Sequence, residues 1–383
     1  MRALAVVFAL ALAPAAAAQP APPRISELAD ELQRIQIRMA EGDQTAYAEQ
    51  LKQLKAIGAA IASVAPETWK SPREADALVV YLLSGGAPAE LATPLSGDAI
   101  ADSRRALARG AAAYIAGRSA EAAELLGKVD PAGLSPRLSG QVAFARSVLT
   151  TERDPKAAVA FLDWARLIAP GTLVEEAALR REIALLAKAR DAPRVAMLTR
   201  QYAARFAASL YAADFFLNLA RLTAEFALAD EPADFERLAR ALAPLSPDAR
   251  GVSWLALAKA ATIGARSGPA VAAAREVLRS VRPDSEDGLR ARLYLDAGRM
   301  LSGEVEAAAA DLRTIPPSKL DRSDVALMAY ARGVATQLRA APSPAAVASQ
   351  SDAAVGAKDS EGAIGLAEEA LKRTADIAEA PKP

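Results

Sequence analysis

Helical periodicity, interrupted at short intervals by proline and glycine, constrains the fold of this chain more than any other feature of its sequence. The pattern is clearest over residues 154–187. Asp154 is a typical helix-capping residue, and Pro155 follows at the first helical position, where the missing N–H is not needed. Apolar residues then recur at helical spacing until Pro170 and Gly171, which are expected to end the helix. A second helix should follow directly, so the segment joins the end of one helical hairpin to the start of the next.

Small residues at recurrent spacing indicate that these hairpins are repeats. In a tetratricopeptide unit, small residues let two helices approach closely, and a proline ends the unit. The spacing of Ala158, Leu162, Ala165 and Pro170 matches the second helix of such a unit. A glycine–alanine–leucine pattern also recurs in register, as Gly110, Gly117, Ala122, Leu126 and Val129, and again as Gly303, Ala308, Leu312 and Ile315.

Most of the remaining chain repeats this alternation of amphipathic stretches and breakers. A capping box is predicted over residues 71–74 (Ser-Pro-Arg-Glu). Aromatic residues at helical spacing after Leu210, and the three tryptophans Trp69, Trp164 and Trp254, are interpreted as core rather than as a ligand groove. The expected fold is all-α, with stacked helical hairpins in a tetratricopeptide-like α-solenoid. Further helices are predicted over residues 25–39, 47–64, 72–83, 210–229, 233–242, 248–266, 269–281, 285–301 and 321–338.

Composition supports an all-helical chain and excludes several functions. Hydrophobic residues make up 52% of the 383 residues, but aromatic residues only 5%, and alanine, the best helix former, supplies much of the difference. Lysine plus arginine and aspartate plus glutamate are equal at 46 each, which argues against nucleic-acid binding. Cysteine and histidine are both absent. The chain therefore lacks a thiol nucleophile, the usual general base and the commonest metal ligand.

The N-terminus has the pattern of a secretory signal peptide. Arg2 is followed by an apolar run over residues 3–12, and small residues up to Ala18 offer a cleavage site before Gln19. The run is shorter than the ~20 residues that span a bilayer, so we expect a periplasmic protein that does not span the membrane. The expected organisation is a signal peptide (1–18), a proline-rich linker (19–24), a helical-repeat domain (25–340), and a low-complexity linker with a terminal helix (341–383).

One cluster of charged residues is a candidate functional site. Glu175 and Glu176 precede Arg180 and Arg181 at helical spacing. We interpret these four residues first as a solvated ion-pair face, which i,i+4 charges commonly form. The alternative is a docking surface, which makes them the candidate partner-binding residues. No catalytic residue, cofactor-binding motif or metal site is predicted, because phosphate-binding loops, dinucleotide fingerprints, nucleophile elbows and zinc spacings are all missing from the sequence.

Two segments resemble a known family. ADALVVYLLSGGAPAEL (75–91) and LDWARLIAPGTLVEEAALRREIALL (162–186) are similar to the MotC family of periplasmic flagellar-motor proteins of rhizobial-type alphaproteobacteria. The signal peptide and the segment GAAAYIAGRSAEAAELL (110–126) agree with this resemblance. The resemblance implies a non-catalytic accessory protein required for flagellar rotation. It also implies a partner, the periplasmic part of the stator protein MotB, and neither a cofactor nor a small-molecule substrate.

Two other classes of protein remain open. A general helical-repeat scaffold of a cell-envelope complex would share every feature above. An enzyme that uses only carboxylates, such as a wall-degrading glycosidase, would need two acids about 5 to 9.5 Å apart in a cleft. The even mixture of charges along the helices argues against the enzyme.

Overall fold

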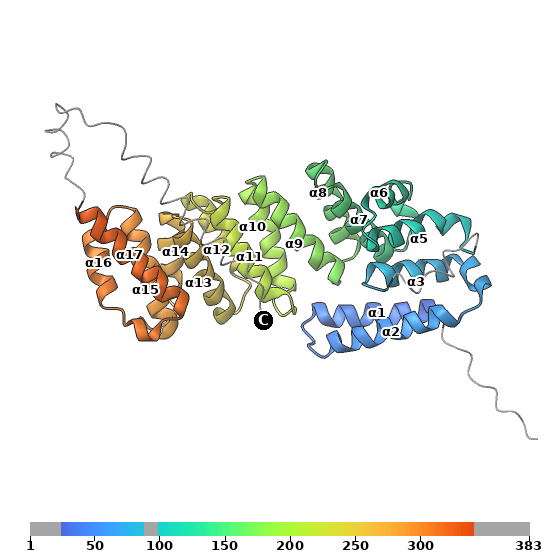
Figure 1. Ribbon diagram of the computed structural model, residues 1–383, viewed down its shortest axis with the longest axis horizontal. Helices are drawn as coiled ribbons and strands as arrows, with labels where there is room; N and C mark the ends of the chain where they lie inside the picture. The colour runs from blue at the N-terminus through green and yellow to red at the C-terminus, as the bar shows by residue number, and fades with distance from the viewer. Residues whose placement is uncertain (1–23, 88–98, 341–383) are drawn as a thin grey trace, which may run out of the picture.

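The chain folds as an elongated array of helices (Figure 1). The computed structural model describes residues 24–87 and 99–340, so the expected signal peptide (1–18), residues 19–23 of the linker and the C-terminal segment (341–383) lie outside the described residues. In the described part there are 16 α-helices and no strand, which confirms the all-α prediction. The helices are α1 (Ile25–Ala40), α2 (Ala46–Ser63), α3 (Pro72–Leu83), α5 (Asp102–Ile115), α6 (Ser119–Gly127), α7 (Pro136–Thr150), α8 (Pro155–Ile168), α9 (Leu173–Lys188), α10 (Ala192–Arg205), α11 (Ala212–Glu225), α12 (Pro232–Leu242), α13 (Pro247–Ile263), α14 (Ser267–Leu278), α15 (Glu286–Leu301), α16 (Val305–Arg313) and α17 (Arg322–Ala340).

Consecutive helices pack together in pairs, and the pairs stack along the array. Helix α5 packs on α6, α7 on α8, α13 on α14 and α15 on α16. Helices α7, α9, α11, α13, α15 and α17 also contact one another in turn, and so form one continuous layer. This arrangement is consistent with a helical solenoid. None of the helices in the described residues is long and apolar enough to cross a membrane.

The local signals of the sequence explain where helices begin, turn and approach one another. The Asp154 carboxylate accepts a hydrogen bond from the backbone N–H of Ala157 at 2.9 Å and caps α8 as predicted. Gly117 and Gly303 adopt left-handed backbone conformations (φ +74° and +97°) in the turns after α5 and α15, where a residue with a Cβ would be strained. Ala122 is fully buried, as the repeat pattern requires.

Three predictions about individual side chains are wrong. Ser71 makes no capping hydrogen bond, and Glu74 turns away from the predicted box to accept hydrogen bonds from the N–H and Oγ of Ser26, at 3.0 and 2.7 Å. Trp164 is 43% exposed rather than core, although its indole N–H donates a hydrogen bond to the Oγ of the buried Ser139 on α7 at 3.0 Å. Leu167 is exposed as well.

The hairpin of α1 and α2 lies below α3 in Figure 1, with both helices directed along the long axis of the array. Helix α1 packs on α3 and, farther along, on α9. The Ser26–Glu74 hydrogen bonds fasten the start of α1. Near its end, Ile35 and Met39 pack with Leu173 and Leu210. The hairpin thus bridges helices that are far apart in sequence.

The core is divided into two large clusters. The N-terminal core joins buried residues from Ile25 to Ala145 and includes Trp69. The C-terminal core runs mainly from Leu179 to Ala335, and it contains Trp254, Phe215 and Phe216, which confirms the interpretation of these residues as core. Tyr211, the first aromatic residue after Leu210, is half-buried and lines a cavity instead. Between the two cores lie a small cluster, formed by Ala143, Leu162, Ala165 and Ala178, and the contacts at the end of the α1–α2 hairpin.

Candidate partner-binding site

Helix α9 carries the predicted site residues, but its two glutamates are not on a solvated face. Glu175 and Glu176 are fully buried, so the prediction of a solvated ion-pair face is wrong for both. Glu175 accepts a hydrogen bond from Gln201 at 2.8 Å and forms an ion pair with Arg205 at 2.9 Å. Glu176 accepts a hydrogen bond from Tyr202 at 2.7 Å. Gln201, Arg205 and Tyr202 all come from α10, so the acids hold α9 and α10 together, while Glu175 also accepts a hydrogen bond from the backbone N–H of Gly171 at 2.5 Å.

The two arginines are half-buried and point to different neighbours. The Arg180 guanidinium lies over the ring of Tyr211, 4.6 Å from its centre, in a cation–π contact. An Nη of Arg181 lies 3.3 Å from Thr151 Oγ1. The four predicted residues therefore do not form one docking surface, and only Arg180 faces a cavity.

Burial changes the acid–base properties of the glutamates on α9. Removal from water raises the pKa of Glu176, although hydrogen bonds from Ser209 and Tyr202 and the charge of Arg180 oppose the rise. Glu182, which sequence reasoning did not single out, is fully buried as well. Burial, helped by the nearby charge of Asp163, raises the pKa of Glu182 to about 7, against the opposing charges of Arg166 and Arg194. A buried acid between two arginines of neighbouring helices has no local sequence signal.

A cleft lies between the α1–α2 hairpin and helices α7 and α9 of the continuous layer. We call it the hairpin cleft. Its main cavity has a volume of about 260 Å³. It adjoins a smaller cavity of about 20 Å³ beside the turn that joins α8 to α9. The two cavities share Gln36, Gln141, Leu173 and Val174. The residues that line only the main cavity are Gln50, Leu83, Ser84, Tyr114, Phe144, Ala145, Ala177, Arg180 and Tyr211.

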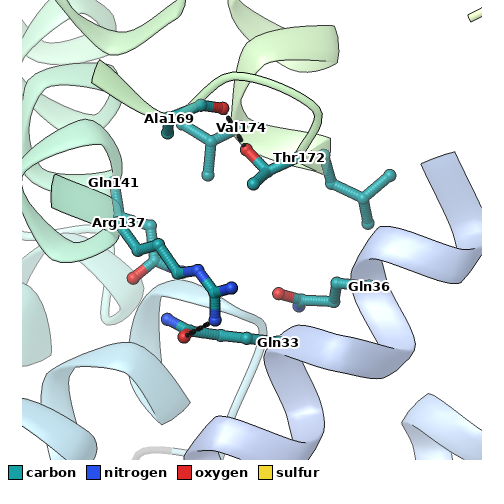
Figure 2. Close-up of a pocket in the computed structure, with 8 residues that line it drawn as sticks. Gln33, Gln36, Arg137, Gln141, Ala169, Thr172 and Val174 are labelled. Carbon is teal, nitrogen blue, oxygen red and sulfur yellow. Dashed lines mark hydrogen bonds between the residues drawn. The ribbon is translucent and has the colours of Figure 1, made fainter.

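The smaller cavity is lined mainly by polar side chains (Figure 2). Gln33 and Gln36 extend from α1 towards Arg137 and Gln141 on α7. An Nη of Arg137 donates a hydrogen bond to Gln33 Oε1 at 2.7 Å. On the opposite side, the Thr172 hydroxyl donates to the Ala169 carbonyl at 2.6 Å and closes the turn before α9.

The cleft offers hydrogen bonds and positive charge. Glutamine side chains supply both donors and acceptors, and arginines supply donors and a fixed charge. Helix α9 also carries three acids, but residues of α8 and α10 already bind them; the acids are Glu175, Glu176 and Glu182. In residues 24–87 and 99–340, no group of three or more acidic residues could hold a metal ion. This arrangement fits recognition of another molecule.

The fold and the cleft thus define the chain as an all-helical, array-like protein with a polar cleft. Its sequence places it more narrowly. A family model described as "Chemotaxis protein MotC" matches residues 1–382, and the chain belongs to the MotC family. It is 31% identical, over 308 residues, to the chemotaxis protein MotC of Rhizobium meliloti (strain 1021), a match that covers 79% of this chain and 70% of that protein. No solved structure matches the chain.

Proposed function

We propose that this protein is a non-catalytic periplasmic accessory protein required for flagellar rotation, and that it binds the periplasmic part of the stator protein MotB. The observation that carries the proposal is the family match over residues 1–382, to a family named for a chemotaxis protein. The stacked helices support it, because tetratricopeptide-like arrays present extended surfaces that bind peptides and domains. No cofactor enters the proposal.

Motility of a deletion strain tests the role in rotation. We expect cells without the protein to assemble normal flagellar filaments that do not rotate, and the gene in trans to restore swimming. Missing filaments would indicate a general envelope scaffold instead. Normal swimming would overturn the proposal.

Export and partner binding need separate measurements. The signal-peptide pattern predicts that mature protein in the periplasmic fraction begins at Gln19. The purified protein, immobilised on a support, should capture the purified soluble periplasmic part of MotB with no other protein present. Cytoplasmic fractionation would contradict the first expectation, and absence of capture would contradict the second.

A further inference from the structure

Three side chains that line the main cavity of the hairpin cleft each carry a buried polar atom without a partner in the described part of the chain. Gln141 is only 7% exposed, and its Nε2 donates to Ser84 Oγ at 3.3 Å, but its Oε1 has no hydrogen-bond partner among the described residues. The same is true of Gln50 Oε1 and Arg180 Nε in that part of the chain. These three atoms come from α7, α2 and α9, and their residues line one cavity. Buried polar groups are nearly always paired, so these three residues have unused hydrogen-bonding capacity beside one cavity.

The charge of the residues that line the two cavities indicates the charge of the ligand. Arg180 and Arg137 line the two cavities, and no aspartate or glutamate does. Glu176 lies near Arg180, whose charge opposes the rise that burial causes in the pKa of Glu176. Glu176 is fully buried, lines neither cavity and accepts a hydrogen bond from Tyr202. A guanidinium presents a planar set of donors that matches a carboxylate. The cleft is therefore complementary to an acidic group.

The remaining polar groups fit a peptide backbone. Each carboxamide has donors and an acceptor, as a peptide unit has, and four glutamines line the two cavities. The shape also matters. The main cavity lies against Gln36 of α1 and Gln50 of α2 and has a volume of about 260 Å³, which limits a bound polypeptide to a few residues. An extended segment of a few residues is the form of polypeptide that enters such a space.

We propose that the hairpin cleft binds a short, extended, acidic peptide segment of the partner protein, with a carboxylate on Arg180 and peptide groups on Gln50 and Gln141. The proposal rests on the proposed function, because it takes the periplasmic part of MotB as the source of the segment. It adds the place of binding, the conformation of the bound segment and its charge.

Two variants remove these interactions, and each has a matched control. Gln141→Leu keeps the volume of the side chain but removes its polar atoms, and Arg180→Gln removes the charge. Gln44→Leu, in the exposed turn after α1, and Arg221→Gln, on the exposed side of α11, change the same residue types away from the cleft. Thermal melts and circular dichroism check the fold of all four. Should Gln141→Leu fail to fold, Arg180→Gln still decides the outcome.

Binding is measured with two probes. The first is the soluble periplasmic part of MotB. The second is a seven-residue peptide of alternating glycine and glutamate, compared with the same peptide carrying glutamine in place of glutamate. We expect the intact protein to bind the first probe and the acidic peptide, and to bind the glutamine peptide about tenfold more weakly or not at all. We expect each cleft variant to lose about tenfold or more in affinity for both, while the controls bind normally.

The outcomes separate the two proposals. If MotB is captured equally by the intact protein and both cleft variants, the cleft proposal is overturned and the proposed function stands. If MotB is not captured, the proposed function fails. In that case the acidic peptide still tests the chemistry proposed for the cleft. Peptide binding that is lost in Arg180→Gln supports the binding of an acidic group by the cleft. No binding means that the cavity holds only water, and the inference is wrong.

Discussion

At the scale of single residues, the acids of α9 show how partners distant in sequence override local spacing. Glu175 and Glu176 precede two arginines of the same helix at a spacing that favours local pairs. In the structure, their partners include Arg205 and Tyr202 of α10. Local spacing gives the distance between charges along one helix, but it contains no information about which side a second helix covers.

Glu182 should make stability depend on pH. Its pKa is about 7 in the folded protein, above the ordinary value of 4.5, so the folded state holds its proton more tightly than the unfolded state does. This stabilisation is complete below the unfolded pKa and is lost as pH rises through about 7. We expect the free energy of unfolding of the natural protein, relative to Glu182→Gln, to fall by about 1–3 kcal/mol between about pH 5 and pH 8.

Urea unfolding at a series of pH values measures this difference. The variant Glu236→Gln is a control, because Glu236 is an exposed acid on α12. Other buried acids, including Asp296, whose pKa burial raises to about 6, titrate equally in every variant and cancel from the comparison. A constant difference between the natural protein and Glu182→Gln across the pH range would contradict the prediction.

Ala158 tests the close approach of helices that the repeat pattern predicts. It is fully buried on α8, whereas Ala160 on the same helix is exposed. Ala158→Leu should lower the free energy of unfolding by about 1–3 kcal/mol, because the larger side chain has no space there. Ala160→Leu should change it by less than about 0.5 kcal/mol. Equal urea midpoints for the two variants would show that α8 does not pack as described.

At the scale of elements, the sequence predicts the helices well and their long-range contacts poorly. Capping residues, prolines and left-handed glycines act within a few residues of one another, so the boundaries of α8 and α9 follow from Asp154 and Gly171. The crossing of α1 over α3 and α9 has no such signal. Glu74 looks like a capping residue until the α1 hairpin brings Ser26 to it. The hairpin cleft, which depends on that crossing, could not be predicted either.

One buried carboxylate links helix α17 to α13 and α15. Asp324 is fully buried and binds Lys259 of α13 and Arg290 of α15, each at 2.9 Å, and accepts a hydrogen bond from Tyr294 at 2.7 Å. Replacing one partner of a buried ionic cluster typically costs about 3–5 kcal/mol, because the remaining charges lose their counter-charge. We therefore expect Asp324→Asn to detach α17 from the array.

Hydrogen exchange provides the measurement for α17. Amides of α17 should exchange much faster in Asp324→Asn, while those of α9 and α11 keep their protection. The control Asp287→Asn removes an exposed acid that pairs with the same arginine, and it should leave α17 protected. Unchanged protection of α17 in Asp324→Asn would mean that its apolar contacts, which include Met328 and Ala331, hold it without the ionic cluster.

At the scale of the whole molecule, the division of the core predicts two unfolding units. The N-terminal and C-terminal cores are joined by a small cluster on α7, α8 and α9, by the end of the α1–α2 hairpin, and by the ion pairs of Glu182. In an array whose repeats contact mainly their neighbours, a substitution destabilises mainly the repeats around it. A destabilising substitution on one side of such a junction should therefore leave the other side partly stable. Residues 143–178 are the expected boundary.

Leucine-to-alanine substitutions in each core test this division. Leu78 of α3 and Leu257 of α13 are both buried, and truncation of a buried leucine costs about 2–5 kcal/mol. Leu78→Ala should speed hydrogen exchange in α1, α3 and α5 more than in α11 to α15, and Leu257→Ala should do the reverse, because each cavity weakens its own core. The two variants cause the same chemical loss, so each is the control for the other. If both speed exchange equally along the entire array, the two cores unfold as one cooperative unit, and the junction at α8 and α9 has no thermodynamic meaning.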